Sequence, residues 1–424
     1  MGTSIELTVG GISLDYSKNH MGNDWGYLFQ EGDLIRRRTA AIDYDYYAEH
    51  PEETEELKEA EETFVSPLSR VLERLALLGH SLDDARTEYQ VVVNDAASMS
   101  DPDEETNPPL TFDDFCELAN RFPISDLADA YIEHETDNRD IVAQGRFAEF
   151  AAEFSRLPWT DNSDLYWSER SYLGSKVCIL GAISMLLVFG LSPANADAEV
   201  EWDFGPIVHA GWVKRDAFQP GIRRGQPILV ATEGASDARI LRRALDLLRP
   251  NVADFFRFID GGERHHFWGT GNLVKFAEGL LRIDIQNRVI FLLDNDAEGV
   301  DAHAKLQALS MPGNLRSMLL PSLDEFQSFP ALGPEGLSDC DINGRAAAIE
   351  CYLDLKLPQY PPGRVIWSNY KKDIDAWHGA LEFKESYAKH FMAQTPVDIT
   401  DGTYDVTKLS KLLDALIAEG ALLS

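Results

Sequence analysis

The hydrophobic pattern in the second half of the chain alternates between two periods. Short runs of apolar and β-branched residues have the length of buried strands, and apolar residues at helical spacing follow them. The elements predicted in this way are strand 227–232, helix 239–248, strand 255–260, helix 272–281, strand 288–293, helix 297–309 and strand 315–320. Because strands alternate with helices, we expect an α/β fold in which helices cover both faces of a parallel sheet.

Acidic residues stand where two of these strands end. Glu233 follows the first strand, and Asp294 and Asp296 follow the third. Ligands of open parallel sheets bind at the carboxyl ends of the strands, and side chains two apart on a strand point the same way. Three crowded carboxylates repel one another unless a hard divalent cation neutralises them, and oxygen ligands suit Mg²⁺ or Mn²⁺. The alternative is a Rossmann-like domain whose strand ends merely carry polar caps.

The order of these motifs resembles a known family. Glu233-Gly234 at one strand end, followed by Asp294-Asn295-Asp296 at a later one, is similar to the signature of the Toprim domain. Topoisomerases, DnaG-type primases and the overcoming-lysogenization-defect nucleases share this domain. The resemblance implies a Rossmann-like sheet and metal-assisted phosphodiester cleavage. It makes Glu233, Asp294 and Asp296 catalytic residues and metal ligands.

Three further residues are candidates for the same site. Asp237 lies one helical turn beyond Glu233 and is either a ligand of a second metal or a first-turn acid favoured by the helix dipole. Glu350 lies in a segment, 341–353, that we expect to start a helix and that resembles the place where those nucleases use an extra Glu. Lys384 lies in a segment that resembles their closing element and is expected to neutralise charge on the phosphate; the alternative is an exposed lysine on an amphipathic helix. One-metal and two-metal mechanisms both stay open.

The first half of the chain shows mainly helical spacing, after an alternating stretch at 5–26 that predicts a strand or hairpin. The apolar segment 177–191 is shorter than a bilayer requires and predicts a buried core helix. The resulting domain prediction is a mostly α-helical domain at 1–200, a connector at 201–225, a Toprim domain at 226–360 and a helical extension at 361–424 that completes the site. This assembly resembles bacterial HEPN/Toprim-associated proteins, which implies a nuclease used against phage or mobile elements.

HEPN ribonucleases carry an Arg followed after four to six residues by a His, and Arg74 and His80 have this spacing. The residue after Arg74 is Leu, where the family uses a polar residue. We therefore expect Arg74 on the surface and His80 at a helix end, without a second active site. His265 and His266, on a loop after a strand, either contact substrate or are incidental.

The charge balance and the cysteine content limit the kinds of function and the cellular location that we expect. With 38 basic and 71 acidic residues the net charge is −33, which argues against broad coating of nucleic acid. The four cysteines form no Cys-x-x-Cys pair, so we expect neither zinc nor disulfides, and a reducing cytoplasm is the expected location. The amino terminus shows no signal-peptide pattern.

The leading hypothesis is therefore a Mg²⁺- or Mn²⁺-dependent endonuclease acting on DNA, tRNA or another RNA. The alternatives are a metal-stabilised scaffold or sensor that binds a protein partner, and a primase-like nucleotidyltransferase. The chain lacks the P-loop motif Gly-x-x-x-x-Gly-Lys-Ser/Thr, so a separately encoded ATPase or sensor would have to supply any ATP-driven step. No membrane partner is expected, and homo-oligomerisation stays open.

Overall fold

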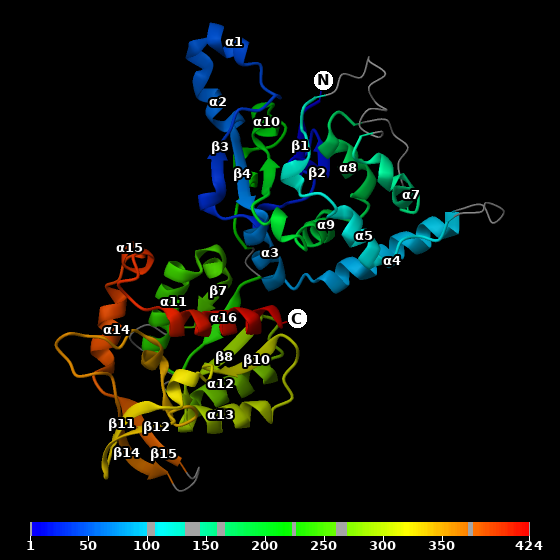
Figure 1. Cartoon of the computed structure of the whole chain (residues 1–424). Helices are drawn as coiled ribbons and strands as arrows, with labels where there is room; N and C mark the ends of the chain where they lie inside the picture. The colour runs from blue at the N-terminus through cyan, green and yellow to red at the C-terminus, as the bar shows by residue number, and fades with distance from the viewer. Residues whose placement is uncertain are drawn as a thin grey trace. The chain divides into compact units, whose positions relative to one another are not determined.

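The computed structural model describes residues 2–99, 107–131, 145–158, 166–222, 226–259, 269–371 and 376–423. The chain divides into two compact units, Met1–Ile222 and Arg223–Ser424 (Figure 1).

An antiparallel sheet of five strands organises the first unit. Its order is β2-β1-β5-β4-β3, with β1 (Ser4–Val9), β2 (Ile12–Lys18), β3 (Leu34–Arg36), β4 (Glu62–Pro67) and β5 (Glu199–Asp203). Gly10 and Gly11 join β1 to β2 with φ of 52° and 81°, which suits a two-residue hairpin turn. The expected opening hairpin is thus present.

The described part of the first unit also contains several helices. They are α1 (Tyr44–Glu49), α2 (Thr54–Ala60), α3 (Leu68–Leu77), α4 (Leu82–Met99), α5 (Phe112–Ala119), α7 (Ala151–Phe154), α8 (Glu169–Val177), α9 (Ala182–Phe189) and α10 (Gly205–His209). A description of this part as mostly helical omits the sheet. The segment expected as a connector from residue 201 begins inside β5, where Trp202 is 1% exposed. It packs between Phe64 and Phe218.

The buried core helix expected within 177–191 is present as α9, although it occupies only the middle of the segment. α8 ends at Val177 and α9 begins at Ala182, with a bend of 114° between them. Within the described residues, no one helix combines the length and hydropathy needed to cross a bilayer; this bent pair meets the criterion only when its helices are counted together.

A parallel sheet of four strands organises the second unit, as predicted. Its order is β10-β8-β6-β7, with β6 (Ile228–Ala231), β7 (Phe256–Phe258), β8 (Val289–Leu293) and β10 (Leu315–Leu319). The helices around it are α11 (Ala235–Leu248), α12 (Thr270–Arg282), α13 (Ala297–Gln307) and α16 (Thr407–Ala421).

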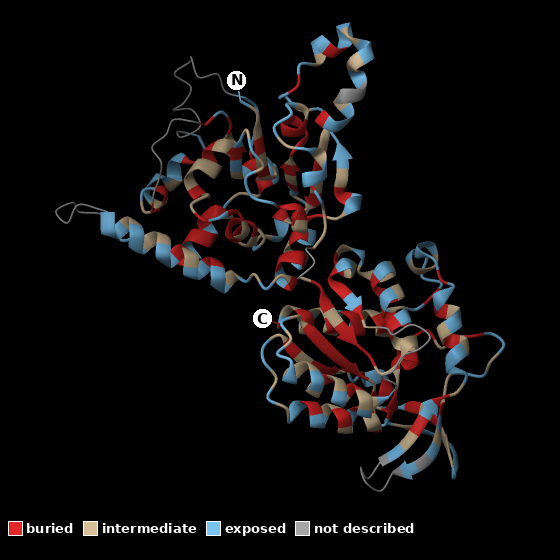
Figure 2. Ribbon diagram, turned by 180° about the vertical axis from the view of Figure 1, so that it is seen from behind, coloured by how far each residue is buried: buried red, intermediate tan, exposed pale blue. Residues whose placement is uncertain are grey.

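These helices lie on both faces of the sheet. α12 packs against α13 on one face, and α11 packs against α16 on the other (Figure 1). All five residues of β8 are buried, which explains why this strand is continuously apolar and does not alternate. In Figure 2 the strands form a buried layer between helices whose outer surfaces are exposed.

The remainder of the second unit departs from the sequence-based expectation. A further sheet has the order β12-β11-β14-β15, with β11 (Phe329–Gly333), β12 (Gly336–Cys340), β14 (Val365–Lys371) and β15 (Ala376–Leu381). Only α14 (Lys384–Met392), α15 (Pro396–Thr400) and α16 of the expected helical extension are helical among the described residues.

The expected helix from residue 341 is also wrong. Ala346 and Ala347 form the short strand β13, which pairs with β9 (Asn295–Asp296), and a 3₁₀ turn, η11 (Ile349–Tyr352), follows. Three successive alanines favour a helix locally, but pairing with a distant strand overrides that preference.

Candidate functional site

The candidate site lies where the order of the parallel sheet reverses. From β6 the chain moves outward to β7 and then returns to the other side of β6 to form β8. The carboxyl ends of β6 and β8 therefore flank a topological switch point, the usual ligand-binding position of such sheets. Glu233 follows β6 and Asp294 follows β8, and the Asp294 backbone N–H donates to Glu233 Oε1 at 3.0 Å.

Asp294 connects this switch point to the turn η11. The backbone N–H of Ile349 donates to Asp294 Oδ1 at 3.1 Å. The next residue in the turn, Glu350, is 6% exposed. Burial raises the pKa of Asp294 well above its usual range, and the neighbouring carboxylates of Asp237, Glu233, Asp296 and Glu350 raise it further. Glu350 is thus part of the cluster, although it lies in a 3₁₀ turn.

Asp237 enters from the first turn of α11. Its Oδ2 accepts the Gly234 backbone N–H at 2.9 Å, and its Oδ1 accepts the Ser236 hydroxyl at 3.1 Å. Burial raises the pKa of Asp237 to about 6, and the carboxylate of Glu350 acts in the same direction. The ammonium of Lys384, the first residue of α14, acts in the opposite direction. Asp237 therefore fits both expected roles, as a helix-start acid and as a member of the cluster.

Asp296 closes the cluster from the start of α13. Its Oδ1 caps the helix by accepting the Gly299 backbone N–H at 2.7 Å. Burial, followed by the charges of Asp296 and Asp237, raises the pKa of Glu233 to about 8, although the Asp294 backbone N–H lowers it. The structure thus brings together all six residues that the sequence singled out for this site.

Two residues that sequence reasoning missed fix this geometry. A Cβ on Gly299 would lie 2.0 Å from the Asp294 carbonyl oxygen, so only glycine allows α13 to begin this close to the end of β8. The buried Asn295 side chain accepts the Gly344 backbone N–H at 2.9 Å and donates to Ser322 Oγ at 3.1 Å. It thus holds two loops against the acidic strand end. Both residues lie in the Asp-Asn-Asp-Ala-Glu-Gly stretch, which gave the only local signal.

The donor chemistry of this cluster fits a hard divalent cation. Its donors are carboxylate oxygens, and their crowding and burial disfavour the charged forms unless a positive charge is added. One carboxylate oxygen of each of three residues, Glu233, Asp294 and Asp296, accepts a hydrogen bond from a backbone N–H. As they stand, no three His, Cys, Asp or Glu side chains in the described part of the chain are spaced as ligands of one metal ion.

Comparison with known proteins identifies the first unit. The model of the family HEPN/Toprim N-terminal domain 1 matches residues 1–226, more than half of the chain. The chain belongs to this family. No curated protein and no solved structure matches it. Because the match ends before β6, the Toprim assignment of the following residues stays a prediction.

Arg74 and His80, the pair with HEPN-like spacing, lie in α3 and just after it. Arg74 lies in α3 and is 1% exposed, so the expectation of a surface arginine is wrong. Its Nε and Nη2 donate to the Tyr27 carbonyl at 3.1 and 3.0 Å. His80 follows the helix, and burial lowers its pKa. His265 and His266 lie outside the described residues.

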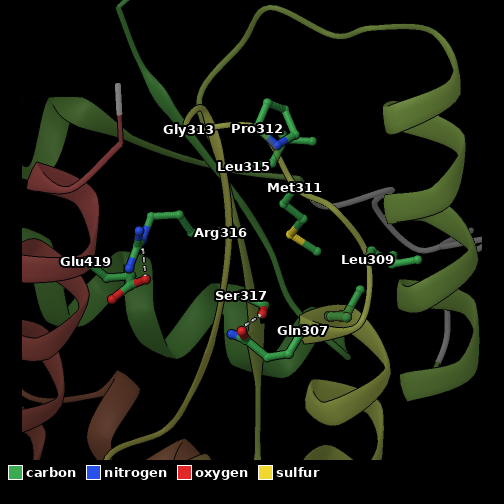
Figure 3. A pocket seen from close by; sticks show the side chains of 10 residues that line it. Gln307, Leu309, Met311, Pro312, Gly313, Leu315, Arg316, Ser317 and Glu419 are labelled. Atoms are coloured by element: carbon green, nitrogen blue, oxygen red, sulfur yellow. Dashed lines mark hydrogen bonds and ion pairs between the residues drawn. The ribbon is translucent and has the colours of Figure 1, made fainter.

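A cavity of about 260 Å³ lies where β10 begins, at the end of the parallel sheet away from the acidic cluster. Figure 3 shows the side chains that line it. The cavity is lined by the end of α13, the start of β10 and Glu419 of α16. The Arg316 and Glu419 side chains point toward each other and form an ion pair, and Gln307 donates to Ser317 Oγ at 3.3 Å. This cavity contains none of the clustered carboxylates, so it belongs to a different part of the unit.

Proposed function

We propose that this family member is a divalent-cation-dependent nuclease of the Toprim type. The observation that carries the proposal is the hydrogen bond from the Asp294 backbone to Glu233 at the switch point, with three further carboxylates around it. A nuclease function agrees with the HEPN/Toprim name of the matched family. A role as an effector in anti-phage defence is part of the proposal and rests on the resemblance of the whole chain.

Glu233, Asp294 and Asp296 would hold the first cation, and Asp237 and Glu350 would contribute to a second. When bound, Mg²⁺ or Mn²⁺ supplies an activated water and stabilises the departing oxygen. The chain orients these ligands through the backbone N–H groups of Asp294, Ile349 and Gly299. The hydrogen bonds fix the carboxylates before substrate arrives, which reduces the reorganisation needed in the reaction.

Two side chains have proposed roles in proton transfer and charge stabilisation. The alternative to a ligand role for Glu233 is a general base that takes a proton from water, and its raised pKa, near neutral pH, suits that role. Lys384 acts on the carboxylate of Asp237 from the start of α14. Its ammonium is placed to offset negative charge on the phosphate.

The test is a cleavage assay with the purified full chain on supercoiled plasmid, single-stranded DNA and total tRNA, in Mg²⁺, Mn²⁺ or chelator. The expected result is metal-dependent cleavage of one substrate class that Glu233→Gln reduces by about a hundred-fold or more. Asp301→Asn is the matched control, because Asp301 lies on α13, is 41% exposed and pairs with Lys305 on the same helix.

The second candidate is a metal-stabilised scaffold or sensor, and the net charge of −33 favours it because such a surface repels nucleic acid. Under this alternative, wild type cleaves none of the substrates, while Glu233→Gln loses thermal stability or a protein partner. If the nuclease cleaves only when ATP is added, a separately encoded ATPase partner becomes part of the proposal.

A further inference from the structure

The turn that carries Glu350 is fastened from the far end of the chain. Lys408, in the first turn of α16, donates from Nζ to the Cys351 carbonyl at 2.6 Å. The Asp354 backbone N–H donates to the Tyr404 hydroxyl at 3.1 Å, and the Asp405 backbone N–H donates to Asp354 Oδ2 at 3.1 Å. Three hydrogen bonds therefore join residues 404–408 to the turn η11 and the residues that follow it.

The position of Lys408 is unfavourable for its own helix. A cation in the first turn faces the positive end of the helix dipole. Burial also lowers the pKa of the Lys408 ammonium, while the Cys351 thiol and the carboxylates of Asp405, Asp354 and Glu325 raise it. Lys411, one turn later, is 48% exposed and pairs with Glu325 at 2.8 Å. The two lysines thus differ in burial and in what they contact.

The opposite side of the same turn faces the acidic cluster. The Ile349 backbone N–H binds Asp294 Oδ1, and Glu350, between Ile349 and Cys351, contributes to the raised pKa of both Asp294 and Asp237. Cys351 is fully buried. A displacement of its carbonyl must therefore be transmitted to Glu350 and Ile349, because the four-residue turn has little room to deform.

We propose that Lys408 is a positioning residue that holds the turn of Glu350 in place for divalent-cation binding. The inference rests on the proposed function of the acidic cluster. Lys408 does not touch the cation or the substrate in this account. It acts through the Cys351 carbonyl, in the way that outer-shell partners orient metal ligands.

The experiment is a calorimetric titration of Mn²⁺ into the full chain, comparing wild type, Lys408→Met and Lys411→Met. Met keeps most of the apolar stem of Lys and removes the ammonium. We expect Lys408→Met to weaken Mn²⁺ binding by about ten-fold or more, as for other outer-shell substitutions. Lys411→Met should bind Mn²⁺ like wild type.

Thermal unfolding without metal separates positioning from general stability. If Lys408→Met lowers the Tm but its folded form binds Mn²⁺ like wild type, the inference is overturned. Should Lys408→Met not fold, Tyr404→Phe removes only a hydroxyl from the same attachment. It is expected to weaken Mn²⁺ binding by a few-fold, and wild-type affinity in this variant overturns the inference. Absence of Mn²⁺ binding by wild type would instead remove the proposed function itself.

Discussion

Both units place carboxylates beside a sheet, but the charged groups around these carboxylates differ. In the first unit, Arg37 pairs with two partly exposed carboxylates, Glu199 at 2.9 Å and Glu201 at 3.2 Å. Burial and the charge of Glu201 raise the pKa of the nearby Asp203, and Arg37 offsets only part of this rise. In the second unit, other carboxylates contribute to the raised pKa of both Glu233 and Asp294, and the hydrogen bonds described for them come from backbone N–H groups.

This difference separates a structural use of acidic residues from a chemical one. A carboxylate that already has an arginine needs nothing else for the charged form to persist. Carboxylates that lie close together repel one another, and a bound cation reduces this repulsion. The comparison therefore predicts that divalent cations stabilise the second unit, whereas the first depends on its own ion pairs and on pH.

The largest loss of stability is expected for a substitution of Gly299. Gly299→Ala would place a methyl group 2.0 Å from the Asp294 carbonyl, so we expect a loss of about 3 kcal/mol or more in the free energy of unfolding of the second unit. Chemical denaturation measures this loss. Gly279→Ala in α12 is the control, because its Cβ would meet nothing within 4 Å and alanine favours the helix. Equal stability of the two variants would contradict the described start of α13.

Asp203 gives the first unit a pH dependence. Burial, followed by the charge of Glu201, raises the pKa of Asp203 from 3.8 to about 7. Because the folded state holds this proton more tightly, the stability that it contributes is complete below the unfolded pKa and is lost as the pH rises through 7. Asp203→Asn should therefore be close to wild type near pH 4 and exceed it by about 3–4 kcal/mol at pH 8. An equal difference at both pH values would contradict this assignment.

Asp294→Asn should raise the stability of the metal-free protein and abolish its stabilisation by Mn²⁺. Removing one charge from the cluster relieves repulsion, so we expect the metal-free protein to gain about 1 kcal/mol. The rise in Tm that Mn²⁺ gives wild type should disappear in this variant. Thermal unfolding with and without Mn²⁺ measures both quantities. A fall in metal-free Tm would contradict the predicted repulsion within the cluster, because asparagine keeps the oxygen that accepts the Ile349 N–H.

The smallest change in stability is expected for a substitution of Arg37. Arg37→Met removes ion pairs whose side chains are 41% and 54% exposed for Arg37 and Glu199, so we expect a loss of about 0.5–1 kcal/mol. Denaturation at low and high salt measures it, and the difference from wild type should shrink at high salt because exposed pairs are screened. A loss that salt does not change would mean that packing of the arginine stem dominates.

The sequence predicted those elements that depend on neighbouring residues better than those that depend on partners far away in the sequence. The strand ends at Glu233 and Asp294 are local features, since an apolar run and the residues after it define them. The sequence could not show that β5 would insert between β1 and β4, because its partners lie more than a hundred residues earlier. The same reason explains the wrong helix from 341, where pairing of Ala346 with Asp296 decides the conformation.

Several site details needed tertiary structure. Glu350 was associated with the site through resemblance, but its place in a 3₁₀ turn follows from the contact between Ile349 and Asp294. The burial of Arg74 follows from the position of the Tyr27 carbonyl, 47 residues earlier. Lys408 carries no sequence motif, and only its hydrogen bond to Cys351 points to it.

The most direct test of the central claim is the rate of nucleic-acid cleavage by the full chain as Mn²⁺ is titrated, for wild type, Asp294→Asn and Asp301→Asn. We predict that wild type and Asp301→Asn show the same saturable dependence on Mn²⁺, while Asp294→Asn stays inactive at every concentration although it is folded. Cleavage by Asp294→Asn at the wild-type rate, or cleavage that persists in chelator, would contradict the assignment of the acidic cluster as a cation-dependent active site.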